Sequence, residues 1–433
     1  MDTIPRKKFM VYSKKNLSSL PQINRIPRQY HDDIKAVSEV IPFRVNNYVL
    51  DELINWDNIP HDPIFQLTFP QAGMLAPEDL ALIKDLNTRK SSESQLKKEV
   101  VRIHQAMNPH PAGQLEKNVP SVEGMEFTGL QHKYNETVLF FPTQGQTCHS
   151  YCTYCFRWVQ FVGMEKLMFA SSKPGNLTSY LRLHPEVTDV LFTGGDPLVM
   201  RAQTLRHYIE PIILQKPGNV STIRIGTKSP AYWPYRFLTD ADAGELLALF
   251  EEIVAAGFHL AIMVHFSHPR ELETPAARQA LKKIIATGAV VRCQAPIVRH
   301  VNDDPQIWIR LWQNIVNNGA FPYYMFVPRD TGAKAYFEMP LAEACRIYSE
   351  AYSRVSGLCR TVRGPSMSAD PGKVHVVGVS DIRGEKVFVM KFIQARNPEW
   401  VNLPFYAAFD ETAAWLDELK PAFGDEKFFF EQD

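Results

Sequence analysis

The sequence predicts an α/β fold: a partial, TIM-like (β/α)6 barrel with a helical N-terminal region and a C-terminal extension. Three observations predict it. Short runs of β-branched and aromatic residues alternate with longer amphipathic stretches between residues 136 and 356. The short runs are apolar almost throughout, as in a parallel sheet that is covered on both faces. The chain has 433 residues, 45% of them hydrophobic and 22% charged, which suits one large barrel with terminal additions.

Six strand–helix units follow one another along the barrel region. The expected strands are Thr137–Pro142, Val187–Thr193, Thr222–Thr227, His259–His265, Ala289–Ala295 and Pro322–Val327. The expected helices are Gly175–Leu183, Arg201–Leu214, Asp240–Ala256, Pro269–Thr287, Pro305–Asn317 and Pro340–Val355. A parallel barrel places its chemistry at the C-terminal ends of its strands, so the loops there are the first places to look for functional residues.

Two further zones flank the barrel, which we assign to residues 131–356. Residues 1–130 form the helical N-terminal region, with helices expected at Pro77–Arg89 and Ser91–Met107. Residues 357–433 form the C-terminal extension. Strands are expected there at Val374–Val379 and Lys386–Phe392, and a helix at Glu411–Leu419.

The balance of positive and negative residues argues against some classes of binding partner. Lysine plus arginine and aspartate plus glutamate both total 47, so the formal net charge is zero. No global field attracts nucleic acid or anionic lipid, which argues against both as partners. No apolar run follows the basic residues near the N-terminus, and apolar stretches such as His259–Phe266 are too short to cross a bilayer. We expect a cytoplasmic protein.

Three of the six cysteines lie within eight residues, directly after the first barrel strand. Cys148, Cys152 and Cys155 have the spacing C-x3-C-x2-C. Thiolates ligate iron–sulfur clusters, which ordinarily take four, so three on one loop leave one iron open to a small molecule. The alternative is a non-catalytic zinc-binding protein with His149 as the fourth ligand. Structural zinc takes four closed ligands and the next cysteine, Cys293, is far along the chain, so the cluster is favoured.

A second motif, Gly194-Gly195-Asp196, ends the second strand. Together with the cysteine spacing it resembles the radical S-adenosylmethionine (SAM) superfamily, in which the open iron of a [4Fe-4S] cluster chelates SAM. The resemblance implies a cluster on the three cysteines and an electron donor such as flavodoxin or ferredoxin. The residues that it implies for SAM binding are Gly194, Gly195, Asp196, His265 and Gln294.

From about residue 62 to residue 379 the chain resembles the lysine 2,3-aminomutase family, whose members also bind pyridoxal 5′-phosphate (PLP). The matches include the run 265–269 after strand four and the run 323–326 on strand six. Lys373, in Ala369-Asp370-Pro371-Gly372-Lys373, resembles the lysine that forms the PLP aldimine, although most glycines of that family segment are missing. Lys133 and Tyr134 match residues that hold PLP.

Two positions depart from the family at the PLP phosphate. Lys133 replaces an arginine, and Thr137 replaces a second one. We therefore expect phosphate recognition to be weaker than in the family or to be supplied by other residues.

The resemblance also addresses the substrate, a single amino acid. Arg157 matches the arginine that binds the α-carboxylate, a task that suits a guanidinium group. Lysine-specific members hold the distal ammonium with two aspartates, and Arg329 and Ser366 occupy those positions here. Like charges in a dry pocket cost several kcal/mol, which argues against lysine. We expect glutamate, aspartate or another polar amino acid, unless Arg329 pairs with Asp330 instead.

The implied reaction is an isomerisation that moves the α-amino group to the β-carbon. One alternative is a radical SAM enzyme of the same subfamily with a different, PLP-independent reaction; the other is the zinc-binding protein above. No cysteine follows Cys359, so the zinc-binding C-terminal cysteines of the family are absent and we expect no zinc site. A homo-oligomer is possible.

Overall fold

A curved sheet of 11 strands forms the centre of the computed structural model, which describes residues 4–108, 118–122, 125–162 and 170–431. Strands β6 to β12 run parallel, with β5 antiparallel at one edge and β13 to β15 antiparallel at the other. The parallel strands are β6 (Thr137–Phe140), β7 (Asp189–Phe192), β8 (Thr222–Thr227), β9 (His259–His265), β10 (Val290–Pro296), β11 (Phe321–Phe326) and β12 (Arg363–Ser368). The two edge strands do not pair, so the barrel is partial, as predicted.

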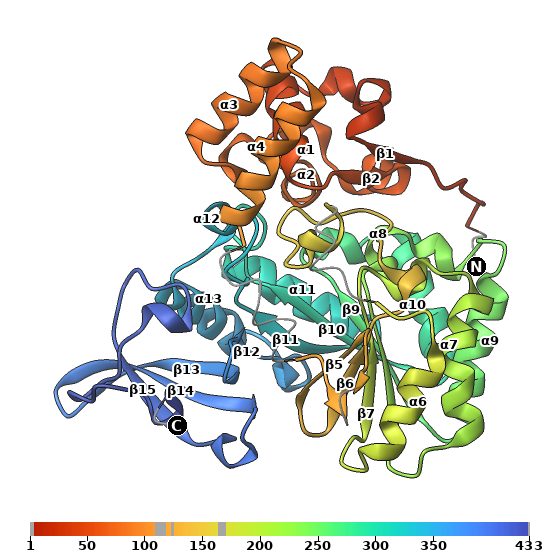
Figure 1. Ribbon diagram of the computed structural model, residues 1–433, viewed down its shortest axis with the longest axis vertical. Coiled ribbons are helices and arrows are strands. Elements are labelled where there is room, and N and C mark those ends of the chain that lie inside the picture. Colours follow the sequence, from red (N-terminus) through yellow and green to blue (C-terminus); the bar gives the residue numbers. More distant parts are fainter. Residues whose placement is uncertain (1–3, 109–117, 123–124, 163–169, 432–433) are drawn as a thin grey trace.

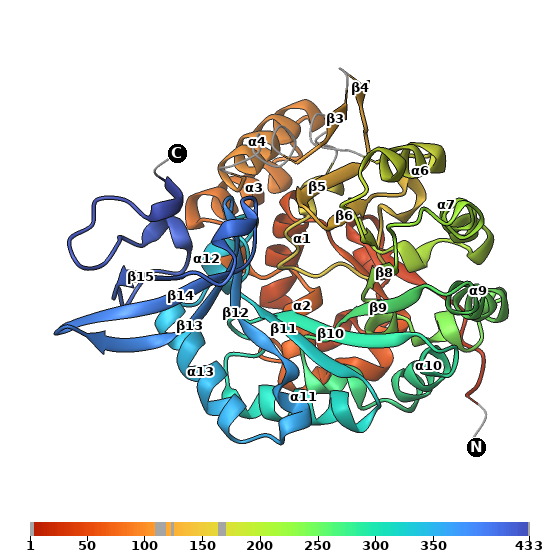
Figure 2. The ribbon, with the colours of Figure 1, turned by 90° about the horizontal axis from the view of Figure 1, so that it is seen from below.

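Helices cover the convex side of the sheet, as Figure 2 shows. They are α6 (Pro174–Leu183), α7 (Ala202–Gln215), α9 (Ala243–Ala255), α10 (Pro275–Ala286), α11 (Pro305–Asn317) and α13 (Leu341–Ser353), and a short α12 (Lys334–Phe337) precedes the last. The short α8 (Ser229–Tyr232) lies below the N-terminal layer (Figure 1), and the Tyr232 carbonyl accepts a bond from Asn46. Along β8, buried residues that pack toward the helices alternate with half-buried ones that face inward. The inner face of the sheet therefore keeps partly accessible side chains.

The six predicted strands are confirmed, with ends that differ by up to two residues. The parallel strand β12 was not predicted. Its Gly364-Pro365 pair disfavours a strand, because proline lacks an amide hydrogen and glycine has low strand propensity. The sheet accommodates the pair by a register shift between Tyr324 and Phe326.

The predicted helix Pro269–Thr287 is two elements. A short 3-10 turn, Pro269–Leu272, precedes α10. Pro275 disfavours helical geometry in the residue before it, and the Thr274 side chain caps the new helix by accepting a bond from the backbone amide of Ala277 at 3.1 Å.

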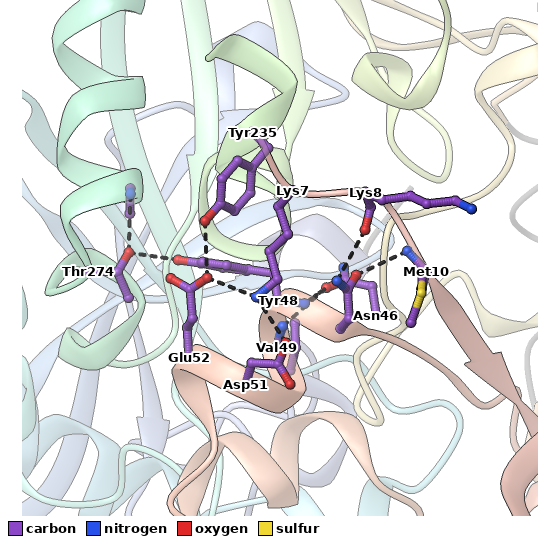
Figure 3. A network of polar contacts seen from close by, with 12 residues as sticks. Lys7, Lys8, Met10, Asn46, Tyr48, Val49, Asp51, Glu52, Tyr235 and Thr274 are labelled. Carbon is purple, nitrogen blue, oxygen red and sulfur yellow. Dashed lines mark hydrogen bonds and ion pairs between the residues drawn. The ribbon is translucent and has the colours of Figure 1, made fainter. Parts of the chain in front are cut away.

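The N-terminal region packs as a helical layer over one end of the sheet (Figure 1). It contains β1 (Val11–Ser13), β2 (Arg44–Asn46), α1 (His31–Val40), α2 (Pro63–Thr68), α3 (Pro77–Thr88) and α4 (Glu93–Ala106); the last two are the predicted helices. Its apolar residues belong to the same core cluster as those of the barrel. Polar contacts join the layers: the Tyr48 hydroxyl lies 2.7 Å from that of Thr274, and the Tyr235 hydroxyl donates to Glu52 at 3.1 Å (Figure 3).

The C-terminal residues extend the same sheet and have a smaller core of their own. The strands there are β13 (Gly372–Ile382), β14 (Glu385–Ala395) and β15 (Pro404–Ala408), and both predicted strands lie within the first two. The remaining short strands are β3 (Ser121–Val122), β4 (Met125–Glu126) and β5 (Leu130–Tyr134). Within the described ranges, no helix is both long and apolar enough to span a membrane.

The predicted helix Glu411–Leu419 is wrong. The segment is irregular except for a 3-10 turn at Leu416–Glu418. Residues 413–416 are buried consecutively, and a helix cannot bury four successive side chains on one apolar face. The Asp410 carboxylate also accepts bonds from the backbone amides of Thr412 and Ala413, which fixes a local turn.

Asp62 provides a test of the contact between the N-terminal layer and the barrel. Its fully buried carboxylate caps α2, accepts a bond from the Asn55 amide at 3.1 Å and pairs with Arg270 of the barrel. Removing it leaves those donors unpaired, so we expect Asp62→Ala to lower the free energy of unfolding by about 3 kcal/mol in urea denaturation. Asp57→Ala, which breaks the exposed pair with Arg25, should cost less than about 1 kcal/mol. Equal losses would contradict the assigned role of Asp62.

Candidate functional site

The N-terminal layer holds the cysteine loop, which follows β6 and contains no helix or strand between residues 146 and 157. The amide of Tyr151 donates to the Arg44 carbonyl at 2.8 Å, and that of Thr153 donates to the Leu67 carbonyl at 2.9 Å. The buried Asn46 side chain donates to the His149 carbonyl, at 3.3 Å, and to the Ser150 hydroxyl and the Tyr232 carbonyl. The loop therefore takes its shape from β2 and α2.

The three loop cysteines are free thiols, and their spacing argues against one zinc ion. Four ligands at about 2.3 Å around zinc lie about 3.8 Å apart. Within the part of the chain described, the one set of three potential ligand atoms inside 4.8 Å of each other is His132, His184 and Glu186, near the N-terminal ends of the strands. At least one pair of the three thiol sulfurs is thus more than 4.8 Å apart, which is wider than one zinc ion requires. A cubane cluster, which offers a separate iron to each cysteine, suits wider spacing.

Burial raises the pKa of all three thiols, that of Cys155 to about 12. The other two cysteines also raise the pKa of Cys148, so the three groups lie close enough to interact. Burial lowers the pKa of His149 to about 3, and its Nδ1 lies 3.0 Å from the Ser229 hydroxyl. This imidazole is therefore neutral and already bonded within the protein.

The glycines at the end of β7 allow this turn to pack directly on the cysteine loop. A Cβ at Gly194, where φ is +142°, would lie 2.2 Å from Gln146, and one at Gly195 would lie 2.4 Å from the Thr147 carbonyl oxygen. The Asp196 carboxylate is buried and accepts bonds from Thr227, Ser229 and the amides of Leu198 and Lys228. It joins the ends of β7 and β8. Its predicted contact with SAM stays a prediction, as do those of the two glycines.

His265 and Gln294 are brought together as the sequence suggested. They are paired neighbours on β9 and β10, and the Gln294 amide nitrogen lies 2.8 Å from Nε2 of His265. Burial, followed by the charges of Lys228 and Arg157, lowers the pKa of His265 to about 3. The imidazole is neutral and can accept a hydrogen bond from Gln294.

The predicted PLP residues also lie together, although they come from opposite edges of the sheet. Lys133 on β5 donates through Nζ to the carbonyl of Ala369, which directly follows β12, and Lys373 is the second residue of β13. The Lys373 ammonium lies 3.2 Å from the Gln394 side-chain oxygen and 4.4 Å from the centre of the Tyr324 ring. Burial raises the pKa of Tyr134 to about 12, against an opposing effect of Arg329.

Lys373 has the properties of an amine that can react with an aldehyde. Burial, and then the charges of Arg224, Arg363, Lys133 and Arg329, lower its pKa to about 7. A lysine is nucleophilic only when it has lost its proton, so about half of this group is reactive near neutral pH. The structure therefore fits the attachment of PLP here.

Two of the predicted substrate residues share one aromatic ring. The guanidinium carbons of Arg157 and Arg329 lie 5.2 Å and 5.1 Å from the centre of Phe156, and Arg157 also stacks on Phe141 at 4.4 Å. Burial, and then the charge of Arg329, lower the pKa of Arg157 to about 9; burial lowers the pKa of Arg329 too. The two guanidinium groups are therefore close enough to repel each other, and an anion between them would reduce that repulsion.

The hydrogen bond of the Ser366 hydroxyl involves neither Arg157 nor Arg329. The Ser366 side chain is fully buried, and its hydroxyl donates to the Met325 carbonyl at 3.3 Å. Its predicted substrate contact stays a prediction. The sequence did not single out Asn46, because its contacts with the cysteine loop come from neighbours distant in the chain and no local pattern marks it.

No protein-family model matches the chain. A protein of Aquifex aeolicus (strain VF5) named putative L-lysine 2,3-aminomutase is 32% identical over 407 residues, which cover 93% of this chain and 94% of that protein. The chain belongs to the radical SAM, lysine 2,3-aminomutase-like family. Family membership agrees with the resemblance seen in the cysteine loop and strand ends.

Other members of this family are more distant. L-lysine 2,3-aminomutase of Haemophilus influenzae is 28% identical over 60% of this chain and 70% of that protein. L-lysine 2,3-aminomutase of Clostridium subterminale is 27% identical over 53% of this chain and 52% of that protein. Among solved structures, Streptococcus suis SuiB matches 68% of this chain and 64% of its own, with a TM-score of 0.38 and 12% identity, a likeness too distant to locate a site.

Cysteine substitution tests the cluster site. We expect Cys152→Ala to lower the iron content after anaerobic reconstitution from roughly four atoms per chain to below about one, because a thiolate ligand is lost. Cys345→Ala, in a buried cysteine of α13, should keep iron and the broad visible absorbance of the cluster. Zinc without iron or sulfide in the wild-type protein would contradict the cluster assignment.

The pKa of Lys373 predicts how PLP attachment depends on pH. Below about 7 the amine is protonated and unreactive, and above it the neutral amine dominates. The rate of attachment, measured by borohydride trapping and peptide mass spectrometry at Lys373, should rise with pH and level off above about 8. A rate that still rises tenfold between pH 8 and 9 would show an ordinary lysine, and Lys373→Ala gives the background.

Proposed function

We propose that this chain is a radical SAM, PLP-dependent aminomutase that moves the α-amino group of an amino acid to its β-carbon. We further propose that the substrate has an acidic or polar side chain, such as glutamate or aspartate. The reaction would be an isomerisation, so the β-amino acid produced has the composition of the substrate. One observation carries the substrate choice: two guanidinium groups flank Phe156 beside the cysteine loop.

The positive charge of these two guanidinium groups supports a substrate that has two carboxylates. Arg157 would bind the α-carboxylate and Arg329 the distal one, and each removes repulsion that the two arginines otherwise exert on each other. A lysine substrate would instead add a third cation to this space, at a cost of several kcal/mol. The relatives named L-lysine 2,3-aminomutase make lysine the natural alternative, and Arg329 is the reason we do not prefer it.

The residues of the chain suggest a division of labour around the two cofactors. Cys148, Cys152 and Cys155 would hold a [4Fe-4S] cluster, with SAM beside Gly194, Gly195, His265 and Gln294; Lys373, Lys133 and Tyr134 would hold PLP. When bound, the cluster and SAM supply the radical, and PLP stabilises the species through which nitrogen migrates.

Two properties of the chain would serve this chemistry. About half of the Lys373 amine is free of its proton at neutral pH, so it can react with an aldehyde there. The buried side chains of Phe141, Trp158 and Val159, which flank the cysteine loop in the sequence, would help keep water from reactive groups. The chain would also need an electron donor such as flavodoxin or ferredoxin.

The test uses anaerobically reconstituted protein with reductant, SAM and PLP against single amino acids, read by mass spectrometry. We expect 5′-deoxyadenosine and a β-amino acid from glutamate or aspartate, and none from lysine. Arg329→Gln should raise the KM for the acidic substrate by about tenfold or more, because a charge-assisted contact is lost. Arg383→Gln, in the β13–β14 turn, is the control.

Two results would overturn parts of this proposal. A β-product from lysine alone would refute the argument from Arg329. Deoxyadenosine without any β-product, unchanged by Lys373→Ala, would instead indicate a PLP-independent reaction of the same family.

A further inference from the structure

Arg363, the first residue of β12, is a cation without a partner. Its guanidinium carbon lies 4.6 Å from the ring centre of Tyr323 and 4.4 Å from that of Tyr324. Throughout the residues that the structure describes, no carboxylate pairs with it and no acceptor takes a hydrogen bond from it. Its five donors are held by aromatic stacking alone, so they are available to an anion.

Lys373 shares the Tyr324 ring with Arg363. Its Nζ atom also lies 4.4 Å from the ring centre, so the two charges are at most twice that distance apart. Arg363 is among the groups whose charge lowers the pKa of Lys373. In PLP the aldehyde and the phosphate extend from neighbouring parts of one pyridine ring. When a lysine is bonded to the aldehyde, the residue that binds the phosphate must therefore lie within a similarly short distance of that lysine.

The residue at the position of the missing family arginine cannot supply the positive charge that binds a phosphate. Thr137 is neutral, and its hydroxyl donates to Asp189 at 3.0 Å. The same carboxylate accepts a bond from Nε of Arg224 at 2.8 Å, so Arg224 is already paired. Lys133 is engaged by the Ala369 carbonyl. Arg329 is assigned above to the substrate, which leaves Arg363 as the neighbouring guanidinium that is held by aromatic stacking and can bind another anion.

We propose that Arg363 binds the phosphate group of PLP, in place of the family arginine that Thr137 replaces. This rests on the proposed function, because it requires PLP at Lys373. A guanidinium fork matches two phosphate oxygens, and stacking on two tyrosines holds it in orientation. The phosphate contact then lies on β12, which pairs with β13, rather than on the strand pair β5–β6.

The experiment compares PLP with pyridoxal, which has the aldehyde but no phosphate. The full chain is titrated with each, the lysine-bound form is followed by its visible absorbance, and attachment at Lys373 is verified by borohydride trapping. The variants are Arg363→Gln and, as a matched control, Arg292→Gln. Arg292 stacks on Tyr323 at 5.5 Å and on Phe321, but not on Tyr324.

Arg363→Gln should weaken PLP binding by about tenfold or more, the usual effect of losing a charge-assisted bond, and change pyridoxal binding by less than about twofold. Arg292→Gln should leave both unchanged. Equal PLP affinity in the Arg363 variant and the wild type would overturn the inference alone. An equal loss with PLP and pyridoxal would also overturn it, since the effect would not involve the phosphate. A wild-type chain that attaches neither compound would refute the PLP role, and the inference with it.

Discussion

The site depends on how the N-terminal layer holds the cysteine loop. That loop has no regular secondary structure, so its backbone polar groups need partners elsewhere. Arg44, Asn46 and Leu67 provide them, from a strand and a helix that come about a hundred residues earlier in the chain. Three thiols can point toward one metal cluster only if the loop has a single shape. The N-terminal region is therefore part of the site rather than an appendage to the barrel.

A second constraint is the excess of positive charge on the inner face of the sheet. Lys133, Arg224, Arg329 and Arg363 all act on Lys373, and Asp189 balances Arg224 directly. Such a group of cations is costly in a partly desolvated space unless anions bind there. A phosphate and substrate carboxylates would provide that balance. Burial, and then the same repulsion, lower the pKa of Lys373 to about 7, so the charge that favours anion binding also favours the reactivity of the lysine.

The accuracy of the sequence predictions follows from how local each signal is. Strands β8 and β9 were predicted to the residue, because β8 alternates buried and half-buried residues and the interior of β9 is a continuous apolar run. Strand β12 was missed, since Gly364 and Pro365 carry no strand signal and only pairing with β11 and β13 extends the segment. The residues 411–419 have helical composition, yet their consecutive burial against the C-terminal core prevents a helix. In both cases tertiary packing overrode propensity.

The sequence by itself determined the cysteine spacing, the order of strands and helices, and the family to which the chain is similar. All of these are local or one-dimensional patterns, which need no knowledge of distant neighbours. Only the tertiary structure decided which charges meet. Arg157 and Arg329 are separated by 172 positions in the chain yet share the Phe156 ring, and Arg363 meets Lys373 on the ring of Tyr324. Such meetings depend on the curvature and register of the whole sheet, and no short stretch of sequence specifies those.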